Sequence, residues 1–551
     1  MYWDEMDAGY QAYSILKTGK DYFGNYPSTV IHSYADFRAP VLIYLLIPFI
    51  AVLGLTTLAV KLPLVLMGTL SIYLIFLVTD KLFRNKRLAL LAGMLTVFAP
   101  WNIQYSRIVY EAIPMLVFFL AGLLFFLKGI EKNKYFIISA IFFSMGMFTY
   151  NTMKLFTPLM LAALIIIYLK KLKITKVTLT AAMVIIITVS GGLYGTIFQK
   201  GGQRFTEISI FSDPHISVQI NNLRHLSNLA YNNSDDVGQQ ARLLDQLLYN
   251  KPLFILDKIF QNYLKAFSLE FLFIKGDPIQ RHSASNVGGL YRIEALTVML
   301  GIIFMILNIN NNSKAVLIII SWSLIAPIPS VLTRDGFNHA TRLFMLFPVL
   351  TITSALGVYY LVHALSSGFK RTSLLLLFVL WVFSLTAYLN FYFGSYNHEN
   401  AKSFQFRFNE ASQVALENKN NYEYVIIDDS NDSALMNYLF VSAYNPGKFQ
   451  SLTQTESINF RLSENFNGYR LDNTIIMKPE IRKWDKAFLE NKFDADYLLI
   501  VTPQQMNEED PEKLLQKLTD YQKLKGIIYY KSGSPAFYVI ESLRPSHNEN
   551  L

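Results

Sequence analysis

The sequence predicts an all-α membrane protein of about ten spans, with juxtamembrane helices and a small C-terminal α/β domain. Three observations support this fold class. The 551-residue chain is 52% hydrophobic and carries only 16% charged residues, whereas soluble domains carry about 25%. Apolar runs of about 17–25 residues, long enough to cross a bilayer, recur from residue 40 to about 392. Beyond residue 395 the composition turns polar and short β-rich runs appear.

The predicted spans are apolar on all sides, as expected of helices surrounded by lipid and by one another. We expect them at about 57–83, 88–106, 112–130, 134–150, 155–170, 177–198, 292–309, 314–332, 341–363 and 371–394. The preceding run, 40–55, has about sixteen residues and contains Pro48. Its length favours a helix in the outer interface over a short span.

Basic residues gather in five short loops that fall at every second connection. These loops are RNKR (84–87), EKNK (131–134), KKLKITK (170–176), NNNSK (310–314) and SGFKR (367–371). The positive-inside rule places them in the cytoplasm. The N-terminal 1–56, the long loop 199–291 and the tail after about 395 then lie outside. The net charge of +9 therefore indicates membrane orientation and not a nucleic-acid partner.

An external N-terminus needs a segment that carries it across the membrane, and we expect one more helix upstream of this chain. A ten-span chain that starts outside is the alternative. The predicted domains are an external catalytic loop with juxtamembrane helices (1–56), a transmembrane bundle that includes the loop 199–291 (57–394) and an extracytoplasmic α/β domain (395–551). The chain has no cysteine, which excludes disulfides, thiolate metal sites and a cysteine nucleophile.

The predicted C-terminal domain has four β-rich runs bounded by turn residues. They are YEYVIIDD, DYLLIVTP, KGIIYYK and AFYVIES. Between the second and the third, DPEKLLQKLTDYQKL has helical spacing, with acidic residues at its start. Both patterns are typical of a small α/β fold.

Ionisable residues at the outer ends of the spans are the candidates for chemistry, because charge near lipid is costly and tends to be functional. The acidic candidates are Asp4, Glu5, Asp36 and Glu111. The basic and imidazole candidates are Arg38, Lys61, Arg107, Lys154, Arg281, His282, His339 and Arg342. A carboxylate can accept a proton from an acceptor hydroxyl or amine. Arginine and lysine bind a phosphate and stabilise its growing charge as it leaves.

Several stretches around these residues resemble one family. They are DEMDAGYQAYSILKTGKDYFG, LAVKLPLVLMGTLSIYLIFLVTDKLF, APWNIQYSRIVYEA, FLFIKGDPIQRHSASNVGGLYRIEAL and FNHATRLFMLFPVL. Together they resemble the C-type (GT-C) glycosyltransferases, multispan enzymes that use polyprenyl-phosphate sugars and include the family 39 protein O-mannosyltransferases and the aminoarabinose transferases. The resemblance covers about residues 1–365. The family usually has Arg-Leu-Pro at the start of a span where this chain has Lys61, which keeps the charge but loses the guanidinium fork.

The resemblance implies a role for each candidate. Asp4 is expected to be the base or the acceptor-orienting carboxylate, and Glu5 to support it. Glu111 would orient a neighbour such as Arg107. The lipid-phosphate end would be bound by Arg107, Lys154, Arg281, His282, His339 and Arg342, with Asp36, Arg38 and Lys61 as secondary candidates. Some relatives bind a divalent metal at the acidic loop and others work without one, so a metal stays open. Asp7, Asp21, His32 and Asp277 are expected to be structural or solvated.

The function implied is an inverting membrane glycosyltransferase. It would move a sugar from a polyprenyl-phosphate donor to a protein, lipid or glycan acceptor on the extracytoplasmic side of the cell membrane. The alternatives are a multispan transporter and a non-catalytic envelope scaffold with a partner-binding tail. Transporters usually place charged or broken-helix sites near the midplane of the membrane, whereas here the span centres are almost purely apolar.

Overall fold

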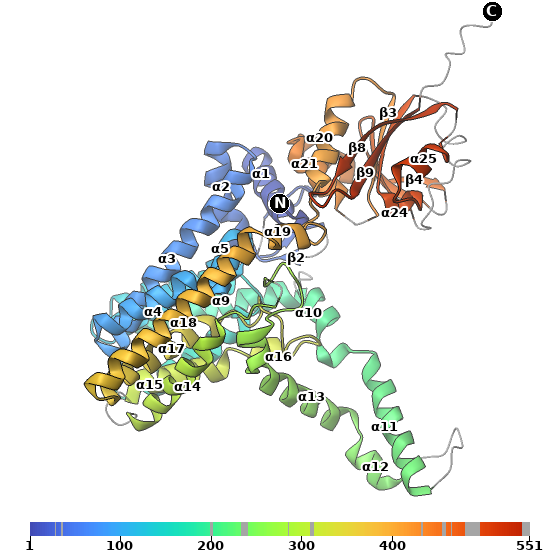
Figure 1. The fold of residues 1–551 in the computed structure, drawn as a ribbon. Coiled ribbons are helices and arrows are strands. Elements are labelled where there is room, and N and C mark those ends of the chain that lie inside the picture. Colours follow the sequence, from blue (N-terminus) through green and yellow to red (C-terminus); the bar gives the residue numbers. More distant parts are fainter. Residues whose placement is uncertain are drawn as a thin grey trace, which may run out of the picture. The chain divides into compact units, whose positions relative to one another are not determined.

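The computed structural model describes two compact units (Figure 1). The described residues are 1–27, 29–34, 37–198, 202–232, 241–284, 286–308, 313–430, 433–454, 459–463, 466–479, 496–518 and 520–542. The first unit comprises Met1–Ala35, Leu42–Pro63 and Phe393–Leu551, and the second comprises Asp36–Val41 and Leu64–Tyr392. The structure therefore groups the N-terminal segment with the C-terminal α/β domain, whereas the sequence predicts three consecutive domains.

The second unit is a bundle of apolar helices. The helices that correspond to the predicted spans are α3 (Thr57–Phe83, from Leu64 on), α4 (Lys86–Phe98), α5 (Pro100–Arg107), α6 (Ala112–Gly129), α7 (Tyr135–Met147), α8 (Met153–Tyr168), α9 (Lys176–Phe198), α14 (Arg292–Leu307), α15 (Ser313–Ile325), α16 (Ile328–Val331), α17 (Leu346–Ala364) and α18 (Ser367–Phe393). They reproduce the ten predicted spans in order along the chain. The predicted helical membrane bundle is confirmed.

Length and composition separate these helices into two groups. Among the described residues, six helices are long and apolar enough to cross a membrane: Thr57–Phe83, Ala112–Gly129, Lys176–Phe198, Ser313–Val331, Leu346–Ala364 and Phe369–Phe393. A seventh span results if Lys86–Phe98 and Pro100–Arg107, bent by 58°, count as one. The bend has a local cause, because Pro100 has no backbone N–H to continue the helix. The runs predicted as spans at 134–150, 155–170 and 292–309 form helices of 13–16 residues.

Two glycines bring α14 and α17 into close backbone contact. A Cβ placed on Gly301 would lie 1.9 Å from the carbonyl oxygen of Thr353, and one on Gly357 would lie 1.8 Å from that of Thr297. The Thr297 and Ser354 hydroxyls, 2.6 Å apart, share a hydrogen bond at the same crossing. Small residues and interhelical hydroxyls are what hold helices together where lipid removes the usual hydrophobic driving force.

The long connection 199–291 is largely helical. It contains α10 (Gln203–Ile208), a 3₁₀ turn (Ile210–Ser212), α11 (His215–Asn232), α12 (Leu243–Leu248), α13 (Lys251–Ala266) and a π-helical turn (Glu270–Ile274). Helix α13 is amphipathic: Leu256, Phe260 and Leu264 are exposed along one side, while Ile255 and Asn262 are buried on the other. The loop that follows the π-helical turn carries two of the candidate residues, Arg281 and His282.

The first unit contains a mixed seven-stranded sheet. In sheet order its strands are β4 (Asn459–Ser463), β5 (Phe466–Leu471), β6 (Thr474–Pro479), β3 (Tyr424–Asp428), β7 (Tyr497–Val501), β9 (Pro535–Ser542) and β8 (Gln522–Tyr529). Strand β3 pairs in parallel with both β6 and β7, and the outer pairs are antiparallel. The C-terminal α/β domain that the sequence predicts is confirmed.

Successive residues of the central strands serve two cores, because side chains alternate between the faces of a sheet. Val425 and Ile427 lie in one buried cluster with residues of α1 (Trp3–Thr18), α20 (Phe408–Asn418), α21 (Ala434–Val441) and α22 (Pro446–Gln454). Ile426 lies in the other, with Leu514 of α25 (Pro511–Leu515). The N-terminal helix is thus a full member of the C-terminal core.

The remaining described elements are short. They are β1 (Ile31–His32), β2 (Phe37–Arg38), α2 (Val41–Leu53), α19 (Tyr396–Glu399) and α24 (Pro503–Met506). The helix predicted over DPEKLLQKLTDYQKL is wrong beyond Leu515, because residues from Gln522 onward form β8 and pair with β9. In a short segment, backbone hydrogen bonds to a neighbouring strand can favour a strand even where the apolar residues have helical spacing.

Candidate functional site

The Asp–Glu pair lies in the first turn of α1, and its two carboxylates have different surroundings. Glu5 is fully buried; its Oε2 accepts a hydrogen bond from the Tyr2 backbone N–H at 3.0 Å, and its Oε1 lies 3.3 Å from Lys61 Nζ. A Glu at this position closes a helix N-terminus by satisfying a backbone donor. Asp4 is partly exposed. The two neighbouring carboxylates therefore differ in exposure and in their partners.

Asp7, one turn further along α1, is a structural residue, as the sequence predicts. Its buried carboxylate accepts hydrogen bonds from the hydroxyls of Tyr22 and Ser33, each at 2.5 Å. Asp21 accepts from the backbone N–H groups of Phe23 and Asn25, at 3.0 and 2.8 Å. These contacts fold the segment after α1 back onto the helix that carries Asp4.

Helix α1 is also held by residues of the C-terminal α/β domain. The Tyr10 hydroxyl donates to the carbonyl of Tyr444 at 3.0 Å. Gln450 Nε2 donates to the Thr18 hydroxyl and to the Asp21 carbonyl, both at 2.8 Å. Burial raises the pKa of the Tyr10 phenol well above its usual value, so it stays a neutral donor. A rigid support of this kind is what a reactive carboxylate needs to hold its position.

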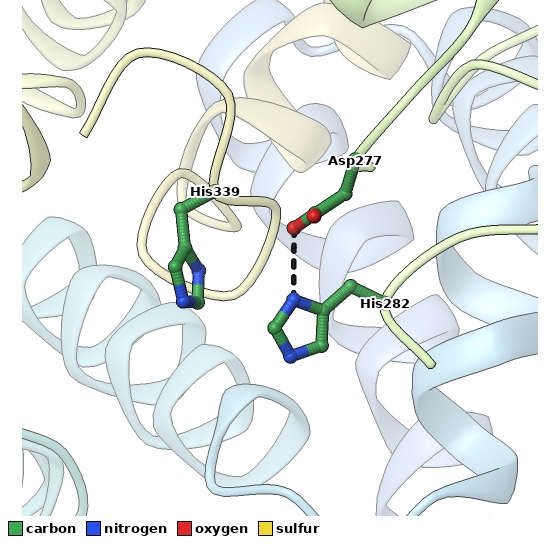
Figure 2. A group of neighbouring side chains, drawn as sticks. All are labelled: Asp277, His282 and His339. Atoms are coloured by element: carbon green, nitrogen blue, oxygen red, sulfur yellow. Dashed lines mark hydrogen bonds and ion pairs between the residues drawn. The ribbon is translucent and has the colours of Figure 1, made fainter. Parts of the chain in front are cut away.

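In the helical unit, three candidate ligand groups converge (Figure 2). Asp277 and His282 come from the loop before α14, and His339 comes from the segment before α17. His282 Nδ1 lies 2.8 Å from Asp277 Oδ2, and the two imidazole ring centres are 4.8 Å apart. The ligand atoms of all three lie within 4.8 Å of one another. Asp277 and His282 are buried and His339 is partly buried.

Backbone amides hold the carboxylate of this cluster in place. Asp277 Oδ1 accepts from the Ile279 N–H at 2.8 Å, and Oδ2 accepts from the Ala340 N–H at 2.7 Å. The second of these bonds ties the loop before α14 to the residue that follows His339. The carboxylate is therefore oriented by groups other than the imidazoles.

The segment at the end of α5 packs against the same cluster. Gln104 Nε2 donates to the carbonyl of Arg281 at 2.7 Å, and the Tyr105 and Thr341 hydroxyls lie 2.8 Å apart. The Tyr110 ring meets the His282 ring edge-on, with centres 5.5 Å apart. Three chain segments distant in sequence thus converge around His282.

The other candidates of this unit have their own partners. The Arg107 guanidinium lies 5.3 Å from the centre of the Tyr392 ring, and Lys154 Nζ donates to the Thr196 hydroxyl at 3.3 Å. Arg342 is buried, donates to the Thr333 hydroxyl at 2.8 Å and forms an ion pair with Asp335.

The remaining candidates are placed as follows. Glu111 directly precedes α6, and Arg38 lies in β2; both are partly buried. Asp36 lies outside the described residues.

Asp277, for which the sequence predicts a structural or solvated role, has more than one kind of partner. Its amide contacts fit a structural role, and its carboxylate also faces both histidines. Its position five residues before His282 in one loop is a local signal. His339 gives no such signal, because only the fold brings it to the other two.

Residues 37–194 match the family described as dolichyl-phosphate-mannose-protein mannosyltransferase. The match confirms over these residues the resemblance to the GT-C glycosyltransferases. It covers β2, helices α2 to α8 and most of α9, including the segments around Arg107, Glu111 and Lys154. No curated protein matches the chain.

Two solved structures are similar in fold to this chain. ArnT from Cupriavidus metallidurans, in the apo state, is 10% identical, with a TM-score of 0.49 over 98% of this chain and 93% of that one. The archaeal oligosaccharyltransferase AglB from Archaeoglobus fulgidus, in complex with an inhibitory peptide and a dolichol-phosphate, is 12% identical, with a TM-score of 0.45 over 80% of this chain. The chain spans 60% of the length of AglB.

Proposed function

We propose that this chain is an integral-membrane glycosyltransferase that uses a polyprenyl-phosphate-linked sugar. The proposal rests on the match of residues 37–194 to a lipid-phosphate-dependent mannosyltransferase family. It also rests on helix α1, which carries Asp4 and Glu5 in its first turn. The sugar would pass, with inversion, to a protein, lipid or glycan acceptor on the extracytoplasmic side of the cell membrane.

The observation that carries the proposal is the unequal environment of Asp4 and Glu5. Glu5 is buried, and its two carboxylate oxygens contact the Tyr2 N–H at the helix N-terminus and the Lys61 ammonium. These contacts give its carboxylate a structural role. Asp4 is partly exposed on the same helical turn. A general base needs access to the acceptor proton and a fixed position. We therefore assign the role of base, or of acceptor-orienting carboxylate, to Asp4, with Glu5 supporting the helix that presents it.

Basic residues of the helical unit are proposed to bind the sugar donor. We propose that Arg107, Lys154, Arg281 and Arg342 contact the phosphate of the carrier directly or through neighbouring groups, and that His282 and His339 serve the same end of the site. Fixed cations stabilise the charge that grows on a departing phosphate. Glu111 would orient a basic neighbour. Among these residues Arg342 has its guanidinium already oriented by Thr333 and Asp335.

The test compares two variants in cells that lack the gene. Asp4→Asn is expected to remove transfer, as judged by mass spectrometry of envelope glycans, while the variant accumulates in the membrane at the wild-type level. A general base typically contributes a factor of about 10²–10⁴ in rate. Asp520→Asn, which alters an exposed carboxylate of the same unit, is the matched control and should restore wild-type glycans. Full glycan transfer by Asp4→Asn would show that the base lies elsewhere or that the chain is not a transferase.

A further inference from the structure

We propose that Asp277, His282 and His339 form a binding site for one divalent transition-metal ion of the Zn²⁺ type. The three residues are those of Figure 2. The proposal stands on the geometry of this cluster and does not depend on the glycosyltransferase assignment.

The chemistry of the donor set favours a transition metal. Two imidazole nitrogens and one carboxylate oxygen suit Zn²⁺ and its neighbours, whereas Mg²⁺ and Ca²⁺ prefer a shell made of oxygen. Three protein ligands leave at least one coordination position for water or for an oxygen of another molecule, as in catalytic zinc sites. The chain has no cysteine, so a closed thiolate site of the structural kind is excluded.

The distances fit a cluster that can close on an ion. Zn²⁺ bonds of about 2.0–2.1 Å place neighbouring ligand atoms about 2.9–3.4 Å apart. His282 Nδ1 and Asp277 Oδ2, 2.8 Å apart, are already close to that range, and the ion would take the place of the proton they share. All three ligand atoms lie within 4.8 Å of one another, so side-chain displacements of about 1–2 Å would bring them to the spacing that the ion needs.

The surroundings provide the outer shell that metal ligands usually have. Metal-binding carboxylates and imidazoles are typically held by further hydrogen bonds, which fix the ligand before the ion arrives. The Ile279 and Ala340 amides do this for Asp277, and Tyr110 packs against the edge of the His282 ring. Because Asp277 and His282 are buried, an ion here would be held by protein ligands and largely shielded from bulk solvent, with a coordination position left for one water or for an oxygen of another molecule.

A purely structural Asp–His pair is the competing explanation, and it makes a different prediction about His339. In a structural pair the carboxylate accepts the imidazole N–H and the second imidazole has no part. In a metal site the second imidazole is a ligand, and its removal abolishes binding without disturbing the Asp277 contacts to the backbone.

The experiment measures metal binding to the full-length chain purified in detergent. After treatment with a chelator, the protein is titrated with ZnCl₂ and bound zinc is counted by mass spectrometry. We expect about one zinc per chain. His339→Gln and His282→Gln are each expected to weaken binding by at least about 100-fold, since the loss of an outer-shell partner alone costs about 10–100-fold. His363→Gln, at an exposed histidine of α17, is the control and should bind as the wild type does.

A second measurement guards against misfolding. Zn²⁺ is expected to raise the thermal unfolding temperature of the wild type and of His363→Gln, but not that of His339→Gln, while all three unfold at similar temperatures without metal. Zinc uptake that His282→Gln and His339→Gln leave unchanged, or a wild type that takes up no stoichiometric zinc, would overturn the proposal. Neither readout involves sugar transfer, so the metal site and the proposed activity can fail separately.

Discussion

Lys61 and Glu5 form an ion pair across 3.3 Å in which the carboxylate is buried and the ammonium is partly exposed. The pair joins the start of α3 to the first turn of α1 within one unit. At the position of Lys61 the GT-C family usually has arginine. Lysine supplies the charge without the two-pronged geometry, and the Tyr2 N–H satisfies the second carboxylate oxygen.

Lys61→Met is expected to destabilise the first unit by about 1–3 kcal/mol, because a buried carboxylate then loses its charged partner. The measurement is the thermal unfolding of the purified chain, with Lys61→Arg as a control that keeps the charge. Unfolding of Lys61→Met at the wild-type temperature would mean that water replaces the ammonium at no cost.

Gln450 is expected to hold the C-terminal end of α1 in place. Its Nε2 donates to the Ser14 and Thr18 hydroxyls and to the Asp21 carbonyl. Gln450→Ala should therefore cost about 1–3 kcal/mol and expose the segment after α1 to protease. Limited proteolysis with peptide mapping checks this, and Gln504→Ala, at an exposed position of the same unit, is the control. Equal cleavage of both variants would contradict the assignment.

Gly357→Ala is expected to disrupt the crossing of α14 and α17. The new methyl group would lie 1.8 Å from the Thr297 carbonyl oxygen, a distance that forces the helices apart. Overpacking typically costs about 1–3 kcal/mol, and here the contact is with rigid backbone. The measurement is the yield and unfolding temperature of detergent-purified protein. Gly192→Ala, where no atom lies within 4 Å of the added Cβ, should be neutral. A fully stable Gly357→Ala would show that this crossing is looser than described.

Asp428 is expected to give the α/β unit a stability that falls as pH rises above about 4. Burial raises the pKa of this carboxyl above its usual value of about 3.8, although hydrogen bonds from Thr502 and Ser430 oppose the shift. The unfolded chain therefore loses the proton first as pH rises, and deprotonation favours unfolding between the unfolded and the folded pKa.

Hydrogen exchange of β3 peptides, compared between wild type and Asp428→Asn at matched pH, measures this effect. The wild type should lose protection relative to the variant as pH increases from 3 to 7. A constant difference across that range would mean that Asp428 ionises normally.

Much of the architecture is readable from the sequence because its signal is local. The free energy of moving an apolar run into lipid depends only on the residues of that run. Each of the ten predicted spans therefore corresponds to one or two helices at the same place in the chain. The β-rich runs at 424–428 and 497–501 also form strands, since short apolar runs of this kind suit strands that are buried on both faces. The average composition of a segment does not show where a helix bends or where a neighbouring strand replaces it. The bend at Pro100 and the end of α25 at Leu515 are therefore not predicted from the sequence.

The roles of the candidate residues depended on partners far away in the chain. The sequence by itself determined that a carboxylate pair and a set of basic residues accompany a multispan bundle. Only the tertiary structure decided that Glu5 is committed to Lys61, that Tyr10 is bonded to Tyr444, and that His339 joins Asp277 and His282. The physical reason is the distance along the chain over which each interaction acts. The hydrophobicity of a span is the sum over consecutive residues, whereas an ion pair or a set of metal ligands forms only where the folded backbone brings separate segments within a few ångströms.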